Sequence, residues 1–434
     1  MTEAVLLGGA EVVDPATGHD GVSDVLVAGE VVEAVGRGLE SHGAEVIGCD
    51  GLVLAPGLVD LHTHLREPGY EYKETIASGT RAAAAGGFTA VSSMANTDPV
   101  TDHAGIVAEI RDKAAEAGLA DVFPVGAVTK GLAGESMAEL GEMVEAGVRM
   151  FSDDGMCVPT PRMLRNALVY AKAFTDEIVI ADHCEDASLV EGGHMHEGSH
   201  SYALGLAGRP AEAEEIVVAR DLAVARATGG RIHVLHVSSA RSVELIRRAK
   251  AEGVRVTAEV TPHHLVFTDD DLVGYDTNFK VHPPLRTAED RDALRAGVAD
   301  GTIDVIATDH APHAVEEKES EFDLSPPGMI GLETALGAVL THVVAPGIVT
   351  LPRAIEAMSG TPARILAAAG HGGPIEPGRP ANLVVFDPAE RWVVDPPFAS
   401  KARNSAFTGS ELSGRVRHTM LRGSFTVAHG KVSR

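Results

Sequence analysis

Asp60, His62 and His64 alternate along one short apolar segment of the chain. On an extended strand, side chains two positions apart point to the same side, so these three would project together. Two imidazoles with this spacing form a natural pair of ligands for zinc. A polar strand end that binds nothing is the alternative interpretation of a single such pair. The other histidines and aspartates of the chain therefore carry the argument further.

Further candidate ligands follow other short apolar segments that are rich in β-branched residues. They are His183, His236, Asp309 and the pair Asp153–Asp154. Histidines that served only as core residues would not all stand at the ends of such segments, so we predict one shared metal centre. His233 would point the other way on its strand and is predicted to be structural.

The number of candidate ligands indicates the chemistry. Four histidines and two carboxylates exceed the needs of one four-coordinate zinc ion. They suit two metal ions that share a bridging hydroxide, which would be a nucleophile near neutral pH. Asp309 could take the proton of that hydroxide and pass it to a leaving nitrogen. We therefore predict hydrolysis of an amide-like bond or its reversal, with Asp309 as the catalytic acid and base.

Two adjacent histidines, His263 and His264, follow the seventh of the apolar segments. A loop or packing role is favoured for them because polar side chains are common in connecting segments. Lining of the pocket by one of them is the alternative.

These ligands need a scaffold that brings distant strand ends together. Short β-branched runs alternate with longer Ala-rich stretches, which indicates βα units and a parallel sheet. Eight parallel strands, most of them followed by a helix, predict an α/β fold with a closed (β/α)₈ TIM barrel, whose active sites lie at the carboxyl ends of the strands. An open doubly wound sheet is the alternative. The runs are 52–62, 88–94, 121–128, 148–152, 177–183, 231–237, 254–260 and 303–309.

The two ends of the chain differ from its centre. Residues 1–55 and 371–434 contain short extended pieces with turn signals and no strong helix, which is typical of sheets. Neither end could hold a good core alone. We therefore predict that both ends meet in one small β-sandwich domain, beside a barrel that spans residues 56–370.

Composition excludes several classes of protein. The 434 residues include 62 Asp and Glu but 36 Lys and Arg, a formal charge of −26, whereas nucleic-acid binding needs a basic footprint. Three cysteines are too few for a disulfide framework and fit the reducing cytoplasm. No apolar run reaches the roughly 18 residues of a membrane span, and the N-terminus lacks the features of a signal peptide. We expect a cytoplasmic protein, not bound to membranes, that acts on a small molecule.

Several motifs occur in the order found in one enzyme family. They are HTHLREPG (62–69), MANT (94–97), FSDDG (151–155), HCE (183–185), ATDHAPH (307–313) and the tail PIEPGRPANLVVFD. Together they resemble the amidohydrolase superfamily and, within it, the class I (bacterial) dihydroorotases, over nearly the whole chain. The resemblance implies zinc-dependent, reversible cyclisation of N-carbamoyl-L-aspartate to L-dihydroorotate in pyrimidine biosynthesis.

The resemblance also implies how two zinc ions would be held. His62, His64 and Asp309 would bind the first ion, and His183 and His236 would bind the second.

A carboxylate would bridge the two ions where many relatives use a carboxylated lysine. The family spacing favours Asp154 as the bridge, and Asp153 is the alternative. Lys130 is an outside candidate for carboxylation.

The substrate carries carboxylates, and a guanidinium is suited to bidentate recognition of that group. Arg66 stands two residues after His64 and is the predicted carboxylate ligand. The further substrate contacts implied by the resemblance are His64, Asn96, His282, His313, Pro327 and Gly328. His282 departs from the family pattern, which has asparagine before the Pro-Pro-Leu-Arg motif. Histidine can still donate a hydrogen bond, but it is wider and can titrate.

Two other functions remain open at this point. One is another cyclic amidohydrolase, such as a dihydropyrimidinase, hydantoinase or allantoinase. The other is a non-catalytic scaffold homologue, although such proteins typically lose metal ligands and all six candidates are present here. The resemblance further implies a homodimer and, as in some relatives, association with aspartate carbamoyltransferase.

Overall fold

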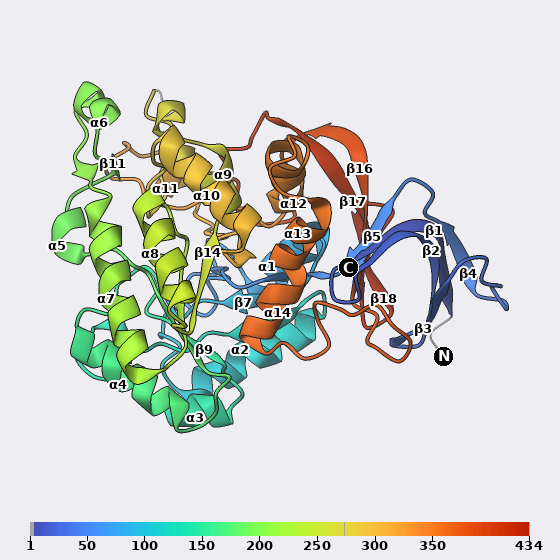
Figure 1. The fold of residues 1–434 in the computed structure, drawn as a ribbon. Helices are drawn as coiled ribbons and strands as arrows, with labels where there is room; N and C mark the ends of the chain where they lie inside the picture. The colour runs from blue at the N-terminus through green and yellow to red at the C-terminus, as the bar shows by residue number, and fades with distance from the viewer. Residues whose placement is uncertain (1–3, 273, 434) are drawn as a thin grey trace.

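The computed structural model describes residues 4–272 and 274–433, and Figure 1 shows a large α/β unit beside a smaller sheet. Eight short parallel strands lie inside the large unit, and each falls within one of the eight predicted runs. These strands are β6 (Leu58–Asp60), β7 (Phe88–Ser93), β8 (Asp121–Pro124), β9 (Met150–Phe151), β10 (Val179–Asp182), β13 (Ile232–Val234), β14 (Val256–Val260) and β15 (Val305–Ile306).

The eight strands form a ring. Strands β6 to β8 make one parallel sheet, and β9, β10, β13, β14 and β15 make another. Isolated parallel bridges join the two sheets at both seams, between Gly126 and Phe151 and between Thr63 and His310. Asp60 reinforces the second seam, because its Oδ1 accepts hydrogen bonds from the backbone N–H groups of His62 and Thr308, both at 3.1 Å. The barrel prediction is therefore confirmed, and the open sheet is excluded.

Helices form the outer layer of this unit (Figure 1). Helix α8 illustrates why: Ser239 caps its first turn, and Val243, Ile246 and Ala249 recur three positions apart as a buried stripe. In the described part of the chain, no helix is long and apolar enough to cross a bilayer. The helices are α1 (Ile76–Ala85), α2 (Ala104–Ala117), α3 (Leu140–Glu145), α4 (Pro161–Lys172), α5 (Ala187–Val190), α6 (Ser199–Leu204), α7 (Glu212–Thr228), α8 (Ala240–Ala251), α9 (Pro262–Val266), α10 (Ala288–Asp300), α11 (Val315–Lys318), α12 (Ala335–Val339), α13 (Leu351–Ile355) and α14 (Thr361–Leu366).

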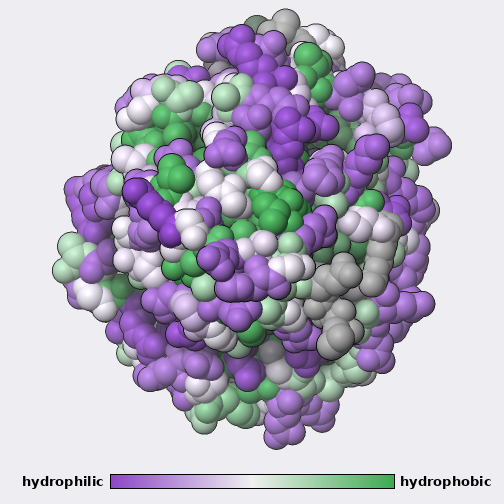
Figure 2. All heavy atoms as spheres, turned by 90° about the vertical axis from the view of Figure 1, so that its right-hand side faces the viewer, coloured by the Kyte–Doolittle hydropathy of each residue, from purple (hydrophilic) through white to green (hydrophobic). Residues whose placement is uncertain are grey.

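Both ends of the chain share one continuous sheet, as predicted. Its N-terminal and C-terminal parts meet where β5 pairs antiparallel with β16. Figure 2 views the molecule from the side on which this sheet lies. The surface there is mostly hydrophilic, with small, separated hydrophobic patches. The strands are β1 (Val5–Asp14), β2 (His19–Ala28), β3 (Val31–Gly36), β4 (Glu45–Gly48), β5 (Val53–Pro56), β16 (Leu383–Val393), β17 (Glu411–Leu421), β18 (Ser424–Ala428) and β19 (Lys431–Val432).

Strand β16 joins the two cores. Successive side chains of a strand point to opposite faces. Leu383 and Val385 accordingly pack in the core of the terminal sheet, whereas Val384 and Phe386 pack in the core of the barrel and its helices. The terminal sheet is thus attached to the barrel through a dry interface.

A long connection between β16 and β17, residues 394–410, leaves the sheet and crosses to the barrel; we call it the crossing loop. Backbone hydrogen bonds between Val394 and Ser410 and between Gly409 and Val394 close its base. Its residue Phe407 is buried with Met329 of the barrel. The crossing loop thus begins and ends in the terminal sheet but packs against the barrel. The domain boundaries at residues 55 and 370 remain predictions.

Phe386 provides a test of the interface between sheet and barrel. Phe386→Ala should lower the free energy of unfolding by about 3–5 kcal/mol, because it leaves a cavity in a fully buried position. The measurement is urea denaturation followed by circular dichroism. Val393→Ala, on the same strand but 55% exposed, is the control and should change stability by no more than about 0.5 kcal/mol. A loss below about 1 kcal/mol for Phe386→Ala would contradict the described packing.

Candidate metal centre

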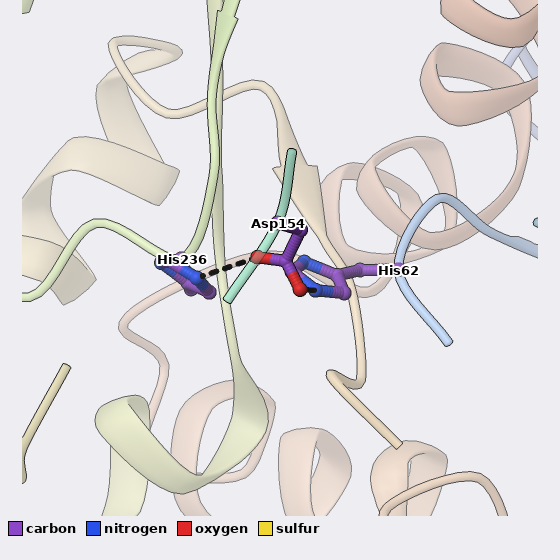
Figure 3. A group of neighbouring side chains, drawn as sticks. All are labelled: His62, Asp154 and His236. Atoms are coloured by element: carbon purple, nitrogen blue, oxygen red, sulfur yellow. Dashed lines mark ion pairs between the residues drawn. The ribbon is translucent and has the colours of Figure 1, made fainter. Parts of the chain in front are cut away.

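Asp154 lies between two pairs of histidines, and each of its carboxylate oxygens faces one pair. Its Oδ2 is 3.3 Å from Nε2 of His62 and 3.4 Å from Nε2 of His64. Its Oδ1 is 3.5 Å from Nδ1 of His183 and 3.4 Å from Nε2 of His236. Figure 3 shows this carboxylate between His62 and His236. A carboxylate in this position can bridge two cations.

The second carboxylate of the centre is Asp309. Its Oδ1 lies 3.1 Å from Nε2 of His64 and 3.5 Å from Nε2 of His62. The structure thus brings together all six predicted ligands, and each follows the carboxyl end of a barrel strand. His62 and His64 follow β6, Asp154 follows β9, His183 follows β10, His236 follows β13 and Asp309 follows β15.

Three of the predicted site residues have left-handed backbone conformations. The φ angles are 63° for Arg66, 30° for His236 and 47° for Asp309. Such angles are uncommon for residues other than glycine and cost free energy, so they persist where the surrounding structure holds them. These backbone conformations therefore lower the stability of the barrel but orient the three side chains toward one place.

The donor atoms fit a metal ion. Within the described chain, Nε2 of His62 and Oδ1 of Asp154 are buried and have no hydrogen-bond partner. A buried polar atom without a partner costs about 1–3 kcal/mol, and a cation would remove that cost. Two groups of three residues each have ligand atoms within 4.8 Å of one another. One group is His62, Asp154 and His236, and the other is His62, His64 and Asp309. Imidazole and carboxylate ligands at these positions suit zinc.

Electrostatic attraction outweighs burial for two ligands of this centre, whereas burial lowers the pKa of His64. Burial opposes ionisation of Asp309, yet His62 and His64 hold the pKa of its carboxyl well below its usual range. Burial likewise disfavours a charged imidazole, but Asp154 and Glu185 raise the pKa of His183 to about 10. Opposite charges a few ångströms apart favour each other's charged forms in this way.

Neither alternative to Asp154 is placed for bridging. Asp153 turns away, since Oδ1 accepts hydrogen bonds from the backbone N–H groups of Val128 and Thr129 at 2.8 and 3.0 Å. Its Oδ2 accepts from the Thr129 hydroxyl at 2.5 Å. Lys130 is half-exposed and forms an ion pair with Glu139 at 2.6 Å.

Carboxylates and an amide behind the ligands orient the imidazole rings, a role that the sequence pattern did not predict for them. Oε1 of Glu259 lies 2.6 Å from Nδ1 of His62, and Oδ1 of Asn96 lies 2.9 Å from Nδ1 of His64. Because the Nδ1 atoms of His62 and His64 have these partners, the tautomers of both ligands are determined.

Glu185 has the same role for His183. Its Oε2 is 3.1 Å from Nε2 of that ligand and forms an ion pair with buried Arg209 at 2.6 Å. His233 is not among the ligands: its Nε2 lies 3.0 Å from Oε2 of Glu259, the carboxylate whose Oε1 faces His62. A glutamate in the apolar segment 256–260 is the signal that could have identified Glu259, because buried carboxylates are almost always paired.

A pocket of about 230 Å³ adjoins the centre. All predicted substrate contacts line it: His64, Arg66, Asn96, His282, His313, Pro327 and Gly328. Arg66 is partly buried, and its Nε donates a hydrogen bond to the carbonyl of Pro312 at 3.2 Å.

His282, the departure from the family pattern, is partly buried in the pocket wall. Among the described residues, its Nε2 has no hydrogen-bond partner. Burial, together with the positive charge of Arg209, holds the pKa of His282 well below its usual range, so the ring is neutral. His264 holds the backbone beside His282, because Nε2 of His264 lies 3.0 Å from the carbonyl oxygen of Pro283. His263 and His264 are both buried, as a packing role predicts.

The remaining predicted contacts are already bonded to the protein. Nε2 of His313 lies 2.8 Å from the carbonyl oxygen of Pro327, and Nδ1 of His313 lies 3.3 Å from Nζ of Lys73. The N–H of Gly328 donates to the carbonyl of Lys280 at 2.8 Å. These residues therefore form a cross-linked pocket wall.

The barrel and its histidine–carboxylate centre define a cyclic amidohydrolase. The chain is similar to the solved structure of an L-hydantoinase (dihydropyrimidinase) from Arthrobacter aurescens, with a TM-score of 0.89 and 26% identity over 100% of this chain and 98% of that one. Residues 51–242 match a family model described as dihydro-orotase-like.

Comparison with individual relatives is more specific. Proteins named dihydroorotase from Streptomyces coelicolor and Leifsonia xyli subsp. xyli are each 53% identical to this chain over 413 residues. The alignments cover 94% of this chain, 96% of the first protein and 94% of the second. The chain therefore belongs to the dihydroorotase family.

Replacing Glu259 tests the outer support of the metal centre. Glu259→Gln should weaken zinc affinity by about 10–100-fold, because an amide cannot accept hydrogen bonds from His62 and His233 at the same time. Zinc dissociation constants from chelator competition measure the effect. Glu333→Gln is the matched control: this partly buried carboxylate accepts hydrogen bonds from the N–H groups of Ala399 and Ser400 instead. A change of less than about threefold for Glu259→Gln would contradict the orienting role.

Proposed function

We propose that this protein is a dihydroorotase that interconverts N-carbamoyl-L-aspartate and L-dihydroorotate in pyrimidine biosynthesis. The observation that carries the proposal is the position of Asp154 between four histidines, beside a pocket that contains Arg66. Both substrates carry carboxylate groups, and a guanidinium in the pocket wall is a suitable partner for one of them. The identity with relatives named dihydroorotase supports the same function.

The types and positions of the donor atoms indicate which residues would hold the metal ions. His62, His64 and Asp309 would hold one zinc ion, His183 and His236 would hold a second, and Asp154 would bridge them. Zinc bound there would polarise the reacting carbonyl group and lower the pKa of a bound water. Imidazole and carboxylate donors at the mouth of a barrel support zinc over the hard cations, which prefer oxygen ligands.

Asp309 would move the proton. Its carboxylate is held ionised by His62 and His64, so it can accept a proton from the attacking water and deliver it to the departing ring nitrogen. In the direction of ring closure, it would remove the proton from the ureido nitrogen. A positioned carboxylate that transfers a proton in this way typically contributes a factor of about 10²–10⁴ to the rate.

Arg66 and His282 would orient the substrate. Arg66 would bind a substrate carboxylate, while the free Nε2 of neutral His282 could donate to or accept from a polar group of the substrate. A dihydropyrimidinase, hydantoinase or allantoinase acting on a neutral ring would not need the positive charge of Arg66 in the pocket wall. A scaffold role is disfavoured because the six ligand side chains converge.

Location and assembly are proposed on other grounds. In the described residues, Cys49, Cys157 and Cys184 are free thiols, which suits a reducing cytoplasm. The family resemblance supports a homodimer and association with aspartate carbamoyltransferase.

Comparing three substrates tests the proposed function. The value of kcat/KM for dihydroorotate should exceed the values for dihydrouracil and allantoin by at least about 100-fold, because the rings without a carboxylate leave Arg66 unpaired. Hydrolysis is measured by the loss of ring absorbance with zinc-loaded protein. Equal or faster turnover of dihydrouracil would reject the proposal in favour of a dihydropyrimidinase.

Asp309→Asn tests the proton transfer. The substitution removes the proton acceptor, so kcat should fall by at least about 100-fold. Zinc content is measured in parallel, because Asp309 is also a proposed ligand. Asp304→Asn, just before the same strand, is the control: Asp304 pairs with Lys250 at 2.6 Å and not with the centre. A near-normal kcat in zinc-loaded Asp309→Asn would reject the assigned role.

A further inference from the structure

Asn404 of the crossing loop reaches the wall of the pocket. The residue is buried, with 4% of its surface exposed. Its Oδ1 accepts a hydrogen bond from the backbone N–H of His313 at 3.1 Å. Its Nδ2 donates to the carbonyl oxygens of Ala311 and Gly328, each at 3.0 Å. One side chain thus joins two segments that line the pocket.

These bonds belong to a closed circuit. Asn404 binds the backbone of His313, and the side chain of His313 binds the carbonyl of Pro327 at 2.8 Å. The next residue, Gly328, closes the circuit because its carbonyl accepts a hydrogen bond from Asn404. Each link fixes the separation of the next two residues. The predicted substrate contacts His313, Pro327 and Gly328 therefore hold their relative positions through a residue of the C-terminal region.

A second group of contacts holds the same turn from another direction. Nζ of Lys318 donates to the carbonyl oxygens of Pro326 and Gly328 at 2.9 and 3.2 Å. Gly328 has a φ of +128°, and a Cβ there would lie 2.7 Å from Cβ of Ala311 and 3.1 Å from Nε2 of His313. The turn consequently approaches its neighbours as closely as a glycine permits, and a small displacement would open the circuit.

We propose that Asn404 is a positioning residue for the substrate. It sets the distance between His313 and the Pro327–Gly328 turn, and it does so from the connection between two strands of the terminal sheet. The proposal rests on the proposed function, in which these residues contact the substrate. Asn404 does not line the pocket itself and lies outside the ligand set, so it acts on substrate binding and not on the metal centre.

The amide group suits this position because it combines one acceptor with two donor hydrogens. Aspartate has nearly the same shape but no donor when ionised, so its carboxylate would face the carbonyl oxygens of Ala311 and Gly328. Asn404→Asp therefore keeps the bond to His313 and breaks the other two, whereas Asn404→Ser keeps a smaller donor and acceptor.

The experiment measures kcat, KM and zinc content of the zinc-loaded full-length enzyme with dihydroorotate. Asn404→Asp should raise KM by about tenfold or more, because the carbonyl of Ala311 loses its donor and the carbonyl of Gly328 keeps only Lys318. The value of kcat should stay within about threefold, and zinc content should not change. Asn404→Ser should give an intermediate KM. A KM within about twofold of the wild type in both variants would overturn the proposal.

Asn382→Asp is the matched control. Asn382 is another buried asparagine; its Nδ2 donates to the carbonyl of Gly370 at 2.8 Å and its Oδ1 accepts from the N–H of Arg422 at 2.7 Å. It lies at the junction of sheet and barrel and not beside the pocket. Its substitution should lower the melting temperature and leave KM unchanged. If Asn382→Asp raised KM as much as Asn404→Asp, general destabilisation would explain both effects and the proposal would be wrong.

Hydrogen exchange separates this inference from the proposed function. Asn404→Asp should speed amide exchange in residues 311–313 and 326–330 more than Asn382→Asp does, whichever substrate the enzyme uses. An inactive wild-type enzyme would overturn the proposed function alone. Unchanged exchange in these two segments would overturn the positioning role. If Asn404→Asp does not fold, Asn404→Ser takes its place in both measurements.

Discussion

The structure depends on one electrostatic constraint: a carboxylate is held in a buried centre, with one oxygen toward each of two histidine pairs. Asp154 is buried, and so are the rings around it. In such surroundings an ionised group is stable only if charges of opposite sign or hydrogen-bond donors surround it. Each ligand ring must also turn one nitrogen toward the centre, so the other nitrogen needs a partner behind it. Glu259, Glu185 and Asn96 meet that second requirement, and the network therefore extends well beyond the atoms that a cation would touch.

The barrel answers this constraint with short strands and strained ends. Strands of two to six residues end at the same rim, so the residues that follow them are free of the pairing pattern of the sheet. Asp309 and His236 use that freedom by adopting left-handed backbone conformations. Asp60, which shares the parity of the two ligands after it, contributes differently, because it ties the first barrel strand to the backbone near the last one. A polar residue that continues the ligand pattern thus stabilises the ring and leaves the chemistry to its neighbours.

Much of the architecture was predictable because it depends on local pattern. The alternation of β-branched and Ala-rich segments predicted every barrel strand, and the histidines and aspartates at the ends of five of these segments predicted the converging ligands. The run 52–62 was less simple, since Gly57 divides it into β5 of the terminal sheet and β6 of the barrel. Composition does not distinguish the two halves; a Cβ at Gly57 would collide with Thr89, a contact that exists only after folding. The contributions of Arg209 and Asn404 were missed for the same reason, because each meets partners that are distant in the sequence and polar residues in loops have no periodicity to mark them.

The pairing of β5 with β16 has a consequence for synthesis of the chain on the ribosome. The two strands are separated by more than 300 residues, and contacts of such long range form late. While translation proceeds, the first five strands emerge with an unprotected edge, and that edge stays open until the segment around Leu383 has left the exit tunnel. Backbone groups on an open edge invite pairing with other chains. The nascent protein thus passes through an interval in which the edge of its amino-terminal strands is open to such pairing, and the interval ends only with the last fifty or so residues.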